Sequence, residues 1–188
     1  MTHTERRDLA HLYGQTPHGV LFVLVDVRGH ASLSPGARSY VTSDAERAGS
    51  SFVADFESEV LRNGLVETRM HVLADADVLV ERGSTAEADA LMEAWMASLE
   101  GELRVVATVL PGDDAALLRF VMDEHGDVLF ASDSLETEDI VPLRRFARTS
   151  AHGVTHVSSH GRLFVERMEP VAPEERILYN DISHTEAE

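Results

Sequence analysis

The longest unbroken run of hydrophobic residues in this chain covers positions 20–25 and continues, after Asp26, to Val27. The run is short for a helix and rich in β-branched valine, so it predicts a strand over residues 20–27. Because polar side chains do not alternate with the apolar ones, we expect this strand to be buried on both faces. It is therefore the expected central strand of a sheet.

Apolar residues at intervals of three and four predict three main helices. The first follows residues 43–46 and the second follows residues 84–87, two segments with the spacing of a capping box. The third begins at Glu138 or Asp139 and has Pro142 in its first turn, where the missing N–H does no harm. The expected ranges are 44–62, 85–99 and 138–149, after a short opening helix over 4–13.

Shorter apolar segments predict strands, several of them joined as hairpins. Turn residues separate these segments, as at positions 123–127 and 158–162. Besides 20–27, the expected strands are 68–73, 78–81, 103–110, 117–122, 128–131, 154–157 and 163–168.

These elements predict an α+β fold with a mixed, mostly antiparallel sheet of about six to eight strands and about three helices packed largely on one face. No linker rich in proline, glycine or serine divides the chain, so we expect a single domain over residues 1–188. Residues 82–84 are the candidate position of a subdomain seam, and residues 183–188 have the composition of a frayed tail. Short similar pieces recur at no fixed period, and we attribute them to strand composition.

The order of elements from Ser84 to Met168 is a helix, a hairpin, a helix and a second hairpin. In this order of elements the stretch resembles small sensor domains such as those of the roadblock or PAS classes. The resemblance implies a regulatory or ligand-binding role.

The charge balance adds an expectation about habitat. The chain has 33 Asp and Glu residues against 16 basic residues, all of them arginine, and its formal net charge is −17. Lysine, normally among the commonest residues, is absent. Molar salt shortens the Debye length to about 3 Å and screens the repulsion within such a surface, while the net charge keeps the protein soluble. We therefore expect a halophilic protein.

The same surface argues against nucleic-acid and membrane partners. Phosphate binding needs clustered basic residues, and only Arg144, Arg145 and Arg148 cluster, near a helix end where cations complement the dipole. The longest apolar run is far shorter than the ~20 residues of a membrane-spanning helix. The chain has no cysteine and begins without a signal-peptide pattern, so we expect a cytoplasmic protein that uses no thiolate chemistry.

Ten histidines and many carboxylates supply the candidate chemistry. His152, His156 and His160 lie on one side of either a helix or a strand, and an i, i+4 pair on a helix can bind zinc. The glycine and β-branched residues among them favour a strand, in which the outer two histidines are roughly 26 Å apart. Asp26 and His30 are the second candidate, a metal or acid–base pair, because ligands bind beyond the strand ends of open α/β sheets.

No dinucleotide-binding, phosphate-loop, metalloprotease or serine-hydrolase motif occurs, so no cofactor is indicated and three hypotheses stay open. The preferred one is a non-enzymatic regulatory or ligand-binding domain of the sensor type, with a small ligand, an unidentified protein partner or a second copy of itself. The alternative is a small metal-dependent hydrolase that uses a divalent metal and the histidine and aspartate candidates. The third is a structural subunit of a larger assembly.

Overall fold

In a computed structural model of the chain, residues 2–28, 34–50, 54–64, 67–110, 116–149, 153–158 and 161–172 are described. These residues form four helices and ten strands, arranged in two five-stranded antiparallel sheets. The first half contains α1 (His3–Gln15), β1 (Val20–Val27), β2 (Arg38–Val41), β3 (Arg47–Gly49), α2 (Ala54–Arg62), β4 (Arg69–Val72) and β5 (Ala76–Arg82). The second half contains α3 (Ala86–Leu99), β6 (Arg104–Val109), β7 (Leu118–Met122), β8 (Val128–Ala131), α4 (Thr137–Thr149), β9 (Val154–Ser158) and β10 (Gly161–Met168).

The two halves have the same topology. Each consists of a helix, three strands, a helix and two strands, and the sheet orders β3-β2-β1-β5-β4 and β8-β7-β6-β10-β9 correspond strand by strand. The registers also correspond, because Leu21 opposes Glu81 in the first sheet and Val106 opposes Glu166 in the second. Residues of β1, β4 and β5 thus lie 85 positions before their counterparts in β6, β9 and β10. The chain is an internal duplication of one structural unit.

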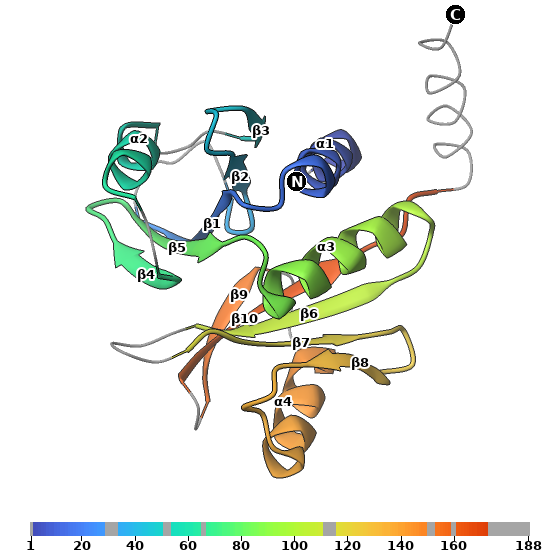
Figure 1. The fold of residues 1–188 in the computed structure, drawn as a ribbon. Coiled ribbons are helices and arrows are strands. Elements are labelled where there is room, and N and C mark those ends of the chain that lie inside the picture. The colour runs from blue at the N-terminus through green and yellow to red at the C-terminus, as the bar shows by residue number, and fades with distance from the viewer. Residues whose placement is uncertain are drawn as a thin grey trace, which may run out of the picture.

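The two units stack with α1 and α3 between the sheets and with α2 and α4 on the outer faces (Figure 1). The central hydrophobic cluster combines both inner helices with the inner faces of both sheets, and Trp95 of α3 is fully buried in it. Two outer clusters lie beneath α2 and α4. In β1, Leu21 and Val23 face the centre whereas Phe22 and Leu24 face α2, which explains why the strand is apolar throughout.

Buried ion pairs cross between the units at equivalent positions. Arg119 of β7 donates to both carboxylate oxygens of Glu81 in β5, at 2.8 and 2.9 Å. The register makes Arg38 of β2 the counterpart of Arg119, and Arg38 pairs with Glu166 of β10. Arg38 also stacks on Trp95, with its guanidinium carbon 4.9 Å from the ring centre. All four charged residues are at most 3% exposed, so polar contacts join the units inside the central hydrophobic layer.

The expected α+β class is confirmed, and β1 has both the bounds and the central place expected of residues 20–27. The expected hairpins are also present, as β4–β5, β7–β8 and β9–β10. The structure differs in detail, because the strands divide between two sheets and the helices occupy three layers. Each unit has a sheet and an outer helix of its own. In addition, α4 begins at Thr137, so Pro142 lies beyond its first turn.

Both expected capping boxes are wrong. Residues 43–46 form the turn between β2 and β3, where Ala45 has a φ of 64°, and α2 begins only after them. This left-handed backbone cannot be part of a helix start. Ser84 is left-handed too, with a φ of 58°, and the N-cap is instead Thr85, whose hydroxyl accepts the backbone N–H of Ala88 at 3.1 Å. As a result, α3 begins one residue later than expected.

Residues 82–84, the expected seam, include the end of β5 and part of the link to α3, so they lie between the two units. That the chain behaves as a single domain stays a prediction, and the expected tail at 183–188 falls outside the described residues.

Among the residues that the structure describes, no helix is long and apolar enough to cross a bilayer.

Candidate functional site

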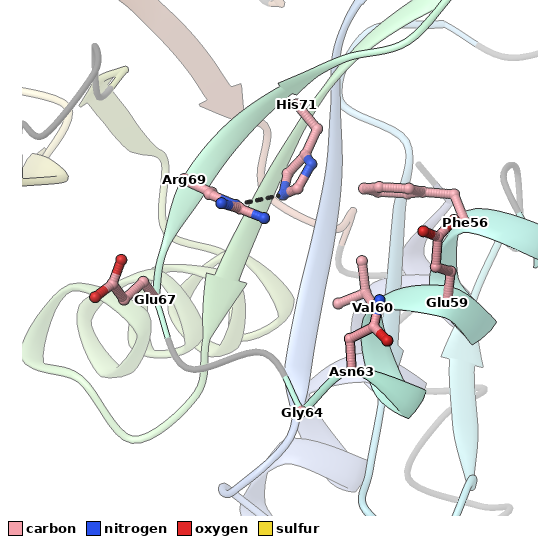
Figure 2. Close-up of a pocket in the computed structure, with 8 residues that line it drawn as sticks. All are labelled: Phe56, Glu59, Val60, Asn63, Gly64, Glu67, Arg69 and His71. Carbon is pink, nitrogen blue, oxygen red and sulfur yellow. Dashed lines mark hydrogen bonds between the residues drawn. The ribbon is translucent and has the colours of Figure 1, made fainter.

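A groove of about 350 Å³ lies on the outer side of the first unit, with α2 on one side and the edge strand β4 on the other (Figure 2). A cavity of this size suits a small molecule. The residues that line it are Phe56, Glu59, Val60, Asn63, Gly64, Glu67, Arg69 and His71.

The helix side of the groove is made by one face of α2. Phe56, Glu59 and Val60 share this face at helical spacing, and Asn63, the residue directly after α2, continues it. Val60 is buried, and the Phe56 ring meets Phe22 of β1 edge to face at 6.2 Å between ring centres, so these two residues anchor α2 on the sheet. Glu59 and Asn63 are exposed and bring polar groups to the groove.

The strand side is made by Arg69 and His71, which lie on the same side of β4 because side chains alternate along a strand. The His71 ring packs edge to face on Phe56, with 4.8 Å between ring centres. The Nε–H of Arg69 donates to Nε2 of His71 at 3.1 Å (Figure 2), which requires this ring nitrogen to be unprotonated. Burial, and then the nearby Arg69 charge, lower the pKa of His71, so the imidazole is neutral at pH 7.

Several polar groups in the groove are free to bind a ligand. Within the described part of the chain, Arg69 uses only its Nε, and the side chains of Glu59, Asn63 and Glu67 form no hydrogen bond. The groove therefore offers guanidinium donors, an amide and two carboxylates beside the apolar surface of Phe56. This combination suits recognition of a small polar molecule with an apolar part.

Neither Arg69 nor His71 was among the candidate residues expected from the sequence. A signal was present, since the two residues alternate along an expected strand that follows an expected helix. What the sequence could not supply was the placement of β4 at the edge of the sheet beside α2.

Asp26 lies near the end of β1, half-buried, and its carboxylate accepts the backbone N–H of Val27 at 2.9 Å. His30, its expected partner, falls outside the described residues, so the Asp26 and His30 site stays a prediction. The strand-end rule that motivated it applies to open α/β sheets, whereas β1 pairs antiparallel on both sides.

Of the three histidines expected to hold a metal, His156 lies in β9, while His152 and His160 are outside the described residues. The backbone of His156 pairs with Leu163 just as that of His71 pairs with Val78, so the two histidines hold equivalent positions in the two units. Among the described residues, no group of three or more His, Asp and Glu side chains could hold a metal ion. The metal site stays a prediction.

No protein-family model matches this chain, and no curated protein does. Among solved structures, a xanthine dehydrogenase from Bacillus halodurans is similar, with a TM-score of 0.59 at 15% sequence identity. The match covers 86% of this chain and 48% of that chain, so this chain spans about half the length of the solved one. At this identity the likeness shows the fold alone.

Proposed function

We propose that this chain is a non-enzymatic, sensor-type domain that binds a small ligand in the groove between α2 and β4. The observation that carries the proposal is a cavity of small-molecule size that contains unpaired hydrogen-bonding groups beside an aromatic surface. The neutral His71 supports it further, because its contacts with Phe56 and Arg69 hold the strand side of the groove in a fixed geometry.

The ligand class that fits this lining is a small zwitterion, a molecule with an ammonium and a carboxylate group on an apolar frame. Arg69 supplies the bidentate donors that a carboxylate prefers. Glu59 and Glu67 supply acceptors for an ammonium group, and Phe56 supplies an apolar face. Free amino acids are the simplest molecules of this kind.

We further propose that the protein works in the salt-rich cytoplasm of a halophile. The support is its charge, because a lysine-free chain with a net charge of −17 repels itself least when salt screens it. Its binding properties are therefore best measured in concentrated KCl.

The proposal is tested by measuring the thermal midpoint of the protein with each of the twenty amino acids, followed by calorimetry on those that raise it. We expect at least one ligand to raise the midpoint, and we expect Arg69→Met to weaken its binding about tenfold or more, the effect of one lost charge-assisted hydrogen bond. The matched control is Arg82→Met, which removes an exposed arginine of the neighbouring strand β5 that does not line the groove.

Equal weakening by both variants, or no stabilisation by any of the twenty, would contradict binding in this groove. Metal analysis of untagged protein separates the hydrolase hypothesis, since stoichiometric bound metal would favour that alternative.

A further inference from the structure

The outward face of α4 in the second unit carries charges that have no partner on their own helix. Leu143 and Ala147 face the sheet and are buried, whereas Glu138, Arg145 and Arg148 are exposed. Within the described part of the chain, the side chains of these three charged residues form no hydrogen bond or ion pair. The helix therefore presents unpaired charge of both signs to solvent.

The sign of these charges changes along the helix, from acidic at its start to basic near its end. Glu138 lies in the first turn and Arg148 in the last, with Arg145 one turn before the end. The helix dipole accounts for Arg148, but its effect falls off within the last turn and does not reach Arg145. The helix dipole thus explains only part of the arginine cluster.

These three charged residues and Val141 form a single stripe on the outer side of α4. Glu138, Val141, Arg145 and Arg148 follow one another at intervals of three, four and three residues, the spacing of a helix–helix contact seam. Val141 is 64% exposed, which makes it one of the most exposed large hydrophobic residues of the described chain. The same face has a hollow of about 380 Å³, lined by Val141, Arg144, Arg145, Arg148 and Thr149.

The opposite charges of the stripe cannot pair within one helix. Side chains pair along a helix at separations of three or four residues, and seven residues separate Glu138 from Arg145. A second α4 that runs antiparallel would place its Arg145 opposite Glu138 of the first helix and its Glu138 opposite Arg145. The centre of such a contact falls at Val141, whose exposed side chains would then bury each other.

We propose that this face of α4 is a self-association surface, on which a second copy of the chain packs its own α4 antiparallel about a two-fold axis. A two-fold contact pairs the same patch on both copies, so each surface must be complementary to itself. The stripe has this property, because its acidic end meets a basic end and its apolar centre meets itself. The contact is small, and the dimer is weak and concentration-dependent. This surface is separate from the ligand groove of the first unit.

The test is sedimentation equilibrium of the whole chain at one KCl concentration in which the wild type is folded. We expect a reversible monomer–dimer equilibrium, and we expect Arg145→Glu to weaken it about tenfold or more, because like charges then face each other twice. Glu138→Arg should weaken it similarly. The double variant Glu138→Arg/Arg145→Glu exchanges the two charges, keeps the net charge, and should restore the dimer.

Arg82→Glu is the matched control, since it makes the same change of charge at an exposed arginine away from α4. Far-UV circular dichroism verifies that each variant is folded. A wild type that stays monomeric at all concentrations would overturn the proposal. So would equal weakening by Arg145→Glu and Arg82→Glu, or a double variant that fails to dimerise. Retention of the dimer in Arg69→Met, whatever that variant does to ligand binding, keeps this result independent of the groove.

Discussion

The first and second units have the same strand order and register, yet their outer helices present different chemistry. In the first unit, α2 and β4 flank a groove in which Arg69, His71 and Glu59 surround an aromatic ring. In the second unit, the outward face of α4 carries an acidic end, an apolar centre and a basic end. The shared backbone thus depends on the apolar layers, whereas the outer helices are free to differ. We propose a ligand site on one unit and a self-association surface on the other.

The buried ion pairs that cross the central layer also differ from each other, although they hold equivalent positions. Arg119 uses all three of its guanidinium nitrogens, donating to Glu81, to the Thr108 hydroxyl at 3.1 Å and to the Glu87 carbonyl. Within the described chain, Nε of its counterpart Arg38 and Oε1 of Glu166 have no hydrogen-bond partner. The two pairs hold equivalent positions in the sheets, but the polar atoms of Arg119 and Glu81 are more completely hydrogen-bonded than those of Arg38 and Glu166.

The largest effect is therefore expected when one partner of the better satisfied pair is removed. Arg119→Leu leaves Glu81 buried without its partner and should lower the free energy of unfolding by about 3–5 kcal/mol. Arg38→Leu should lower it by less, since fewer hydrogen bonds are lost. Urea unfolding in concentrated KCl measures both changes.

The variant Arg119→Leu/Glu81→Leu tests the cause of this loss. Because it removes the stranded carboxylate as well, it should recover a large part of the lost stability. A greater loss for Arg38→Leu than for Arg119→Leu would show that hydrogen-bond satisfaction does not distinguish the two pairs.

Salt should act on both units together. The thermal midpoint should rise by on the order of 10 °C from dilute buffer to molar KCl, since screening worth a few kcal/mol moves the midpoint by about 2–4 °C for each kcal/mol. Because the two units share the central cluster, we expect one cooperative transition in scanning calorimetry. Two transitions would mean that the units unfold separately, and a flat or falling midpoint would refute the salt adaptation.

The smallest effect concerns His71. Its counterpart in the second unit is His156, whose side chain is not among those that the structure describes. The pKa of His71 lies below the ordinary value of 6.5, first because of burial and then because of Arg69. A histidine whose folded pKa is lowered stabilises the fold above its unfolded pKa, and this contribution is lost as the pH falls below about 6.5 and through the folded pKa. The expected loss of stability is small because the ring is only half-buried.

An NMR titration of the His71 ring checks the direction of this shift. Arg69→Met should raise the pKa without returning it fully to 6.5, because burial remains after the arginine charge is gone. A wild-type His71 pKa at or above 6.5 would contradict the packing of His71 against Phe56 and Arg69.

The sequence predicted those parts of the fold that depend on continuous apolar patterns. The run at 20–27 is β1, and the apolar stripe with Trp95 is α3. The strands β2 and β3 were missed because they are short and because residues 43–46 between them imitate a helix start. A pattern of residue types alone does not reveal that the backbone turns left-handed at Ala45.

The duplication escaped the sequence analysis because equivalent positions hold different residues. Val23 corresponds to Thr108 and Leu79 to Phe164. Each pair keeps an inward-facing side chain, but the residue types differ, so the sequence shows no repeat. Only strand register shows that Arg38 and Arg119 are counterparts. The groove between α2 and β4 was hidden for a similar reason, since its two sides come from separate elements that only the tertiary fold brings together.

The most direct test of the proposed ligand site is the proton–carbon NMR spectrum of the histidine rings during titration with the amino acid that stabilises the protein most. His71→Gln assigns the signal of His71, and the exposed His125 in the turn before β8 serves as the internal reference. We predict that the His71 signal shifts and saturates with the ligand while the His125 signal stays in place. A ligand that saturates the protein without moving the His71 signal would contradict binding in the groove between α2 and β4.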